Sequence, residues 1–204
     1  MELSRTTLEH LYGEEKKSVS AIARLFGCSE HKINYWIRRF GIPKRSISES
    51  VYLYYNPHGD PFRFYEPKTL DEAFLFGMGL GLYWGEGTRK NKNQVRLGNT
   101  DPNLIKAFMK FLERTYGVPK EKLKFGLQIF SDMIPEEAQT FWEQELGVSS
   151  DRFYKLVITP ARSLGTYREK TRHGVLTVHF NNTKLRNILV NHCQDSSVGR
   201  AYAW

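Results

Sequence analysis

The chain has 204 residues and a formal net charge of +8, because 30 Lys and Arg residues stand against 22 Asp and Glu residues. Its 40% hydrophobic content excludes wholesale disorder, and no apolar run reaches the roughly 18 residues of a membrane span. Two distant cysteines without a CxxC pair exclude a disulfide scaffold or a zinc ribbon. The first residues show no signal-peptide pattern, so we expect a cytoplasmic, nucleoid-associated protein with no membrane partner and no small-molecule substrate. The polyanion that such a basic protein would meet is nucleic acid.

Positive charge gathers in residues 22–46, 88–124 and 152–186, whereas residues 125–151 hold acidic residues and no Lys or Arg. This separation indicates one side of the protein that binds DNA and another that faces solvent. The alternative is that each charge run is merely a solvated face.

Residues 1–48 predict three short helices. The first covers about residues 6–14, the second follows Ser18 or Ser20 as its cap, and the third covers residues 30–40 after Ser29 as its cap. Glycine at position 41, followed by Ile42 and Pro43, ends the third helix. The side chains expected in the core of the second and third helices are Ile22, Ala23, Leu25, Phe26, Ile33, Trp36, Ile37 and Phe40.

Three of these positions have a spacing that a turn between two crossing helices requires. Ala23 lets the helices approach closely, Gly27 supplies the positive φ of a tight turn, and Ile33 anchors the third helix in the core. The unit resembles a helix-turn-helix of the resolvase and invertase type, which implies that the third helix reads DNA. The alternative is a three-helix bundle that contacts protein. The expected DNA contacts are Ser29, His31, Lys32, Asn34, Tyr35, Arg38, Arg39, Lys44 and Arg45.

Residues 49–68 predict an aromatic linker that packs on a second domain at 69–193. In this domain we expect helices at 70–86, 101–116, 135–146 and 183–192, and strands at 94–99, 123–130, 153–159 and 174–180. A polar hairpin at 88–93 and a basic loop at 162–172 connect some of them. Thr69 and Asp101 are the expected caps of the first two helices.

The helix at 70–86 contains glycines that each cost about 1 kcal/mol relative to Ala in a helix interior. Gly77, Gly81 and Gly85 lie four residues apart and form a stripe without side chains, along which a second helix could approach backbone to backbone. The other residues are large and apolar, so we expect the helix to be buried nearly all round. It nevertheless ends in a carboxylate, Glu86, where the helix dipole disfavours negative charge.

The nonapeptide GLGLYWGEG, residues 79–87, resembles the LAGLIDADG motif of homing endonucleases. Gly81 and Gly85 fall on its small positions, Glu86 on its terminal acid and Gly87 on its last glycine. The resemblance covers about residues 70–193 and departs from the family in two ways, since Trp84 replaces the first acid and Glu86 replaces the commoner Asp. It implies an α+β protein in which an N-terminal three-helix helix-turn-helix domain precedes a LAGLIDADG-type mixed α/β domain with an antiparallel saddle sheet.

The same resemblance implies a homodimer that cleaves double-stranded DNA. Family helices pair at a two-fold axis, so one motif per chain implies two chains, each contributing Glu86 and the Gly85 carbonyl as ligands of Mg²⁺. Basic residues near that site would polarise phosphate or water, Gln94 would position water, and further basic residues would line the DNA groove. The expected residues are Arg89, Lys90, Lys92, Gln94, Arg96, Lys122, Lys124, Lys155, Lys170 and Arg172.

Two alternatives to an active endonuclease remain open from the sequence. Some transcription regulators share this fold without cleavage, and an intron RNA maturase would share it too. A zinc site at His173, His179, His192 and Cys193 fits no ligand spacing. Residues 194–204 are expected to form a disordered tail, and Asp195–Ala201 matches what one frame of a tRNA gene would encode, which suggests a reading frame that ends inside such a gene.

Overall fold

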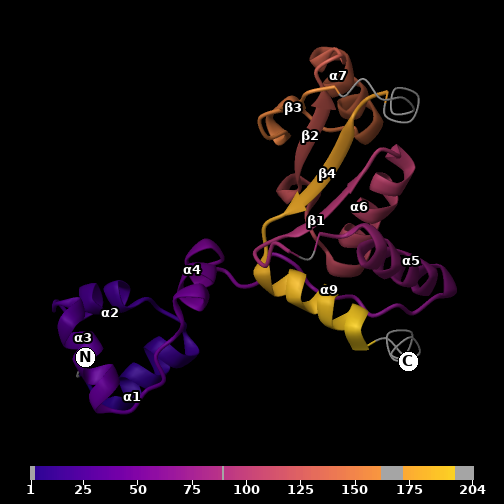
Figure 1. Ribbon diagram of the computed structural model, residues 1–204. Coiled ribbons are helices and arrows are strands. Elements are labelled where there is room, and N and C mark those ends of the chain that lie inside the picture. The colour runs from indigo at the N-terminus through magenta and orange to yellow at the C-terminus, as the bar shows by residue number, and fades with distance from the viewer. Residues whose placement is uncertain (1–2, 89, 162–171, 196–204) are drawn as a thin grey trace, which may run out of the picture. The chain divides into compact units, whose positions relative to one another are not determined.

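The computed structural model describes residues 3–88, 90–161 and 172–195, and these divide into two compact units. We call residues 1–60 the N-terminal unit and residues 61–204 the C-terminal unit, and each is described by itself (Figure 1). Arg89, Lys170 and residues 196–204 of the expected tail lie outside the described residues, whereas Gln194 and Asp195, also expected in the tail, belong to the last helix. None of the described helices is long and apolar enough to cross a membrane.

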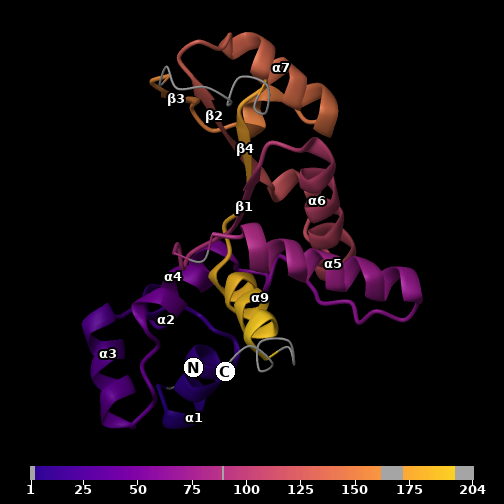
Figure 2. The same ribbon diagram turned by 45° about the vertical axis from the view of Figure 1, so that its right-hand side comes forward.

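The N-terminal unit is helical (Figure 2). Its elements are α1 (Arg5–Leu8), a π-helical turn at Glu9–Glu14, α2 (Val19–Leu25), α3 (Glu30–Arg39) and α4 (Ile47–Tyr55). The first four surround a small apolar core of Leu8, Leu11, Tyr12, Ile22, Ala23, Ile33, Ile37 and Ile42.

Local capping explains where these helices begin and end. The Ser18 hydroxyl accepts a hydrogen bond from the Ala21 amide at the start of α2, and the Ser29 hydroxyl accepts one from the Lys32 amide at the start of α3. Gly27 and Gly41 adopt φ values of +58° and +66° in the turns that follow α2 and α3, a conformation that costs glycine little. The predicted caps and the predicted turn glycine are therefore confirmed.

Two sequence expectations for this unit are wrong. Leu25 is 53% exposed, because α2 turns Ile22 and Ala23 toward the core and Leu25 away from it. The segment 49–68 is not linker throughout, since α4 occupies its first part. Ser46 caps α4 by accepting from the Glu49 amide, and no residue of α4 is buried.

The C-terminal unit is an α+β unit. Its helices are α5 (Leu70–Glu86), α6 (Pro102–Tyr116), α7 (Pro135–Leu146) and α9 (Thr183–Asp195), and its strands are β1 (Val95–Asn99), β2 (Lys124–Phe130), β3 (Val157–Thr159) and β4 (Val175–Phe180). Single 3₁₀ turns at Lys120–Lys122 and Ser150–Arg152 precede β2 and β3. The expected caps are present: Thr69 and Glu72 form a capping box on α5, and the Asp101 carboxylate accepts from the Asn103 amide at the start of α6.

The chain enters this unit through an extended aromatic segment. The amides of Arg63 and Tyr65 donate to the carbonyls of Tyr116 and Thr115. The Phe64 ring lies 5.5 Å from the Tyr116 ring, measured between centroids. The second part of the segment 49–68 therefore packs on the C-terminal unit, as its aromatic content predicts.

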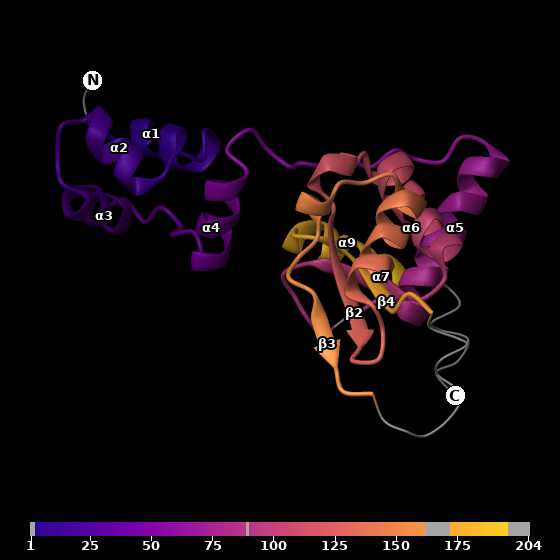
Figure 3. The same ribbon diagram turned by 90° about the horizontal axis from the view of Figure 1, so that it is seen from above.

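The four strands form one sheet in the order β1-β4-β2-β3. β4 pairs antiparallel with both β1 and β2, whereas β3 pairs parallel with β2, beside which it lies in Figure 3. The sheet is therefore mixed, which corrects the expectation of an antiparallel sheet. The parallel pairing follows from the connection, because the chain crosses over through α7 before it returns as β3. Gly87 bridges Leu97 in antiparallel fashion, as the predicted hairpin requires.

The sheet has one buried and one open face because residues alternate along each strand. The side chains that face α5, α6, α7 and α9 form the core, and they include Leu97, Phe125, Leu127, Leu176 and Val178. The opposite face carries mostly polar residues and small ones, and we call it the open sheet face. Its members are Arg96, Gly98, Lys124, Gly126, Gln128, Phe130, Val157, Thr159, Val175, Thr177 and His179.

Candidate nucleic-acid interface

The outer face of α3 is polar and basic. Ile33 and Ile37 are buried against the core, which turns the intervening positions outward. The Asn34 side chain donates to the Glu30 carbonyl at 3.0 Å, and Arg38 Nε donates to the Asn34 carbonyl at 3.3 Å. The exposed residues of the helix, its cap and the turn beyond it include the predicted contacts Ser29, His31, Lys32, Tyr35, Arg38, Arg39 and Lys44, and Asn34 is half-buried.

Arg45 does not belong to this exposed set, although the sequence analysis placed it there. Its guanidinium lies 3.9 Å from the centre of the Tyr12 ring. Nη1 donates to the Lys16 carbonyl at 2.8 Å, and Nη2 donates to the Lys17 carbonyl. Arg45 therefore joins the end of the helix-turn-helix to the segment that follows its first helices, and both terminal nitrogens of its guanidinium donate inside the unit.

The centre of the open sheet face carries a row of three nitrogen-bearing side chains. In the register of the sheet, His179 of β4 is the partner of Arg96 on β1 and of Lys124 on β2. Residues opposite each other on neighbouring strands have Cβ atoms about 4.5–5.5 Å apart. The four strands contain no Asp or Glu. Their open face is therefore positively charged.

At two positions of this face, a glycine leaves no side chain that could protrude from the sheet. A Cβ at Gly126 would lie 2.9 Å from His179 Nε2, and a Cβ at Gly98 would lie 2.9 Å from Thr177 Oγ1. His179 and Thr177 thus lean over positions where a larger residue would clash. A flat sheet surface with few protruding side chains can meet a broad ligand such as a nucleic-acid groove.

The surroundings of His179 favour the neutral form of its imidazole ring. It is only 7% exposed, Nδ1 lies 3.1 Å from Gln94 Oε1, and the Tyr154 ring lies perpendicular to it with 5.1 Å between the ring centroids. Burial, and secondarily the Arg96 charge, lower the pKa of His179 to about 4. The sequence analysis had weighed His179 only as a zinc ligand. The alternation of β4, VLTVHF, was the available signal, since it puts His179 on the same face as Thr177.

The other predicted groove residues are spread over several elements. Lys122 is exposed in the 3₁₀ turn before β2, and Lys155 is exposed just before β3. Both residues were expected on the basic strands that line the groove, and neither of them lies on a strand. Lys90 and Lys92 are exposed in the hairpin loop, and Arg172 is exposed before β4. Lys124 Nζ donates to the Asp151 carbonyl at 3.2 Å.

One face of α5 is open, which corrects the expectation that this helix is buried nearly all round. Only Gly79 and Tyr83 are buried, whereas Leu70 and Phe74 are 89% and 72% exposed. Among the described residues nothing lies within 4 Å of a Cβ built at Gly77, Gly81 or Gly85, so the described part of the chain leaves the predicted stripe uncovered.

Glu86 is exposed at the end of α5 and has no side-chain partner within the described part of the chain. The Gly85 carbonyl precedes it. Among the described residues, no three His, Cys, Asp or Glu side chains gather where they could hold a metal ion. Mg²⁺ commonly binds one or two carboxylates together with substrate phosphates, so one carboxylate per chain suits a site shared between two chains.

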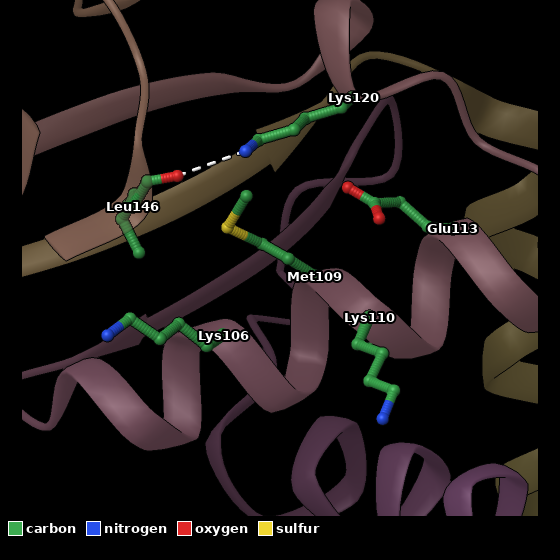
Figure 4. A pocket seen from close by; sticks show the side chains of 6 residues that line it. All are labelled: Lys106, Met109, Lys110, Glu113, Lys120 and Leu146. Carbon is green, nitrogen blue, oxygen red and sulfur yellow. Dashed lines mark hydrogen bonds between the residues drawn. The ribbon is translucent and has the colours of Figure 1, made fainter.

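A hollow of about 150 Å³ lies between α6 and the end of α7 (Figure 4). Lys120 Nζ donates there to the Leu146 carbonyl at 3.0 Å, and Lys106 pairs with Glu145. These two lysines hold elements of the fold together. We therefore do not count the hollow as part of the nucleic-acid interface.

Comparison with known proteins identifies the N-terminal unit. The family model described as MerR HTH family regulatory protein matches residues 17–58, which include α2, α3 and α4. No curated protein and no solved structure matches the chain. These comparisons support neither the resolvase and invertase type of helix-turn-helix nor the LAGLIDADG resemblance. The chain therefore contains a MerR-family helix-turn-helix domain, which binds DNA and is typical of transcription regulators.

Proposed function

We propose that this protein is a transcription regulator that binds double-stranded DNA as a homodimer. The observation that carries the proposal is the exposed basic face of α3 within a MerR-type domain. A recognition helix of this kind enters the major groove, with polar side chains on base edges and cations on phosphates. Lys32, Arg38 and Arg39 are the main candidates for these contacts.

In this proposal the open sheet face adds a second DNA contact. Arg96 and Lys124 flank His179 across three strands, and none of the four strands contains an acidic residue. Phosphate contacts supply most of the non-specific affinity of such proteins. Contacts from this face would add to the affinity that α3 supplies.

The homodimer would form along α5. The exposed positions Leu70, Phe74, Gly77, Gly81 and Gly85 follow one another at helical spacing along one face. Exposed large apolar residues beside open glycines favour a partner helix that approaches closely, and a second α5 related by a two-fold axis provides one. This pairing also agrees with what the LAGLIDADG resemblance implies.

A second candidate function, a Mg²⁺-dependent DNA endonuclease of the LAGLIDADG homing type, is favoured by one observation. Glu86 ends α5 as an exposed carboxylate without a partner in the described chain. Two-fold pairing of α5 would bring two such carboxylates toward each other. Glu86 and the Gly85 carbonyl would hold Mg²⁺, which when bound activates water and stabilises a leaving oxygen.

One experiment separates the two candidates. Duplexes bound by the full chain are selected from a random library in Ca²⁺, Mg²⁺ is then added, and DNA ends are mapped for wild type and Glu86→Gln. Asp71→Asn, at the opposite end of α5, is the matched control. Specific binding that leaves the DNA intact with all three proteins is the result expected for a regulator. Staggered double-strand ends produced by wild type and Asp71→Asn but absent with Glu86→Gln would overturn it in favour of the endonuclease.

The dimer is tested separately by sedimentation. We expect wild type to sediment as a dimer at micromolar concentration. Gly81→Leu should shift it to a monomer, because a side chain at that position keeps two backbones apart. An unaltered dimer in Gly81→Leu would exclude α5 as the interface.

A further inference from the structure

His179 is the buried titratable group of the open sheet face. Its Nδ1 donates to Gln94 Oε1 at 3.1 Å, because an amide oxygen can only accept. In the neutral ring Nε2 then carries the lone pair. That atom lies over Gly126, whose missing side chain leaves space beside it.

The groups that face His179 in the described chain do not stabilise a positive charge on it. Arg96 on β1 and Lys124 on β2 are cationic, and the Tyr154 ring lies perpendicular to the His179 ring. Lys124 donates to the main-chain carbonyl of Asp151, and the Asp151 carboxyl has its own neighbours, since the Ser149 hydrogen bond and the Lys124 charge lower its pKa. Burial and Arg96 in turn lower the pKa of His179. The free protein therefore carries a neutral imidazole between two cations.

We propose that His179 takes up a proton from solvent when a DNA phosphate binds between Arg96 and Lys124, and that it then donates a hydrogen bond from Nε2 to that phosphate. The inference rests on the proposed contact between the open sheet face and DNA. A neutral Nε2 accepts hydrogen bonds, as phosphate oxygens do, so the two repel each other. The protonated ring turns this repulsion into a charge-assisted hydrogen bond.

The consequence is DNA affinity that rises as pH falls. A phosphate adds negative charge beside His179 and offsets the effect of Arg96, so the pKa of His179 rises from about 4 in the free protein. If it returns to the ordinary value of about 6.5, linkage predicts about tenfold tighter binding per chain at pH 5.5 than at pH 7.5.

The test measures binding of the full chain to one selected duplex from pH 5.5 to pH 8. Wild type should show the rise in affinity, and His179→Gln should lose it, because Gln keeps a polar contact but does not titrate. His58→Gln, at an exposed position outside the proposed interfaces, is the matched control and should keep the rise. Lys124→Gln reports whether the open sheet face touches DNA.

A second readout does not depend on a variant that must fold. The NMR signal of the His179 ring in wild type should stay in its neutral form at pH 6 in the free protein and change to its charged form in the complex. A ring that remains neutral in the complex would overturn the inference.

The binding curves distinguish the two possible failures. If Lys124→Gln weakens binding while wild type and His179→Gln share one pH profile, the sheet touches DNA and the proton linkage is wrong. If Lys124→Gln binds as wild type does, the sheet contact in the proposed function is wrong, and the inference falls with it.

Discussion

Gly79 and Gly81 stand two residues apart in α5 and give a direct test of how this helix is packed. A Cβ at Gly79 would lie 2.1, 2.2 and 2.6 Å from three ring carbons of Phe111, which is itself fully buried in α6. A Cβ at Gly81 would meet nothing within 4 Å. Gly79→Ala and Gly81→Ala therefore add the same methyl group to the same helix in opposite surroundings.

The magnitude follows from two opposing effects. Replacing Gly by Ala inside a helix stabilises it by about 1 kcal/mol. Carbon atoms prefer separations of about 3.5–4.0 Å, so the Phe111 ring would have to move by more than an ångström, and overpacking of this kind costs about 1–3 kcal/mol. We expect Gly79→Ala to lower the free energy of unfolding of the C-terminal unit by up to about 2 kcal/mol, and Gly81→Ala to raise it by up to about 1 kcal/mol.

The assay is urea unfolding, followed by circular dichroism and by tryptophan fluorescence, at a protein concentration low enough to keep the chain monomeric. Trp142 is fully buried in the C-terminal unit and reports its unfolding. If both variants are equally stable, α5 does not pack Gly79 against Phe111. A destabilised Gly81→Ala monomer would refute the open stripe on which the proposed dimer depends.

Three further changes test the rest of the molecule. Arg45→Ala should destabilise the N-terminal unit by about 2 kcal/mol in thermal unfolding, because it removes charged hydrogen bonds to two carbonyls, whereas the neighbouring exposed Lys44→Ala should change stability by less than about 0.5 kcal/mol. The pKa of His179 is lower in the folded chain than the ordinary 6.5. Its contribution to stability is therefore complete above about pH 6.5 and falls by up to about 3 kcal/mol as the pH drops toward 4. In urea unfolding measured at a series of pH values, His179→Gln should reduce the loss of stability between about pH 6.5 and about pH 4. Lys32→Ala should lower the slope of log affinity against log salt by about 1 if Lys32 contacts a phosphate, and an unchanged slope would remove it from the interface.

Elements with local signals could be predicted from the sequence. The bounds of α5 and α7 agree with the prediction, and the bounds of α6 differ only by the cap residue. Thr69 and Asp101 mark the starts of α5 and α6 because each caps its helix through a hydrogen bond to a nearby amide. The missed helix α4 also had a signal, since Ser46 is followed three residues later by Glu49. The many aromatic and turn-forming residues of the surrounding segment led to its interpretation as a linker.

Properties that depend on tertiary packing could not be predicted in the same way. β3 pairs parallel with β2 because of where the chain returns after α7, and no residue of β3 specifies that direction. The exposure of α5 was wrongly predicted. Hydrophobic composition indicates which surfaces a helix could bury against any partner, but within the single chain only Gly79 and Tyr83 of α5 are buried. Arg45 was placed among DNA contacts by its charge, although Tyr12 and two distant carbonyls determine its position.

Glu86 is where the two candidate functions make opposite predictions about binding alone. If α5 helices pair, the two Glu86 carboxylates approach each other and the phosphates of bound DNA. Without divalent cations each carboxylate then weakens DNA binding. The Coulomb repulsion between one carboxylate and one phosphate at about 6 Å in water is about 0.7 kcal/mol, or about threefold in affinity. In EDTA we therefore expect Glu86→Gln to bind the duplex more tightly than wild type for either function. In Ca²⁺ or Mg²⁺ a regulator that does not use the carboxylate keeps this order, whereas an endonuclease reverses it, because its wild type gains the cation as a bridge between Glu86 and phosphate. Equal affinities of the two proteins in EDTA would show that Glu86 lies far from DNA, which would exclude the endonuclease and the paired α5 geometry together.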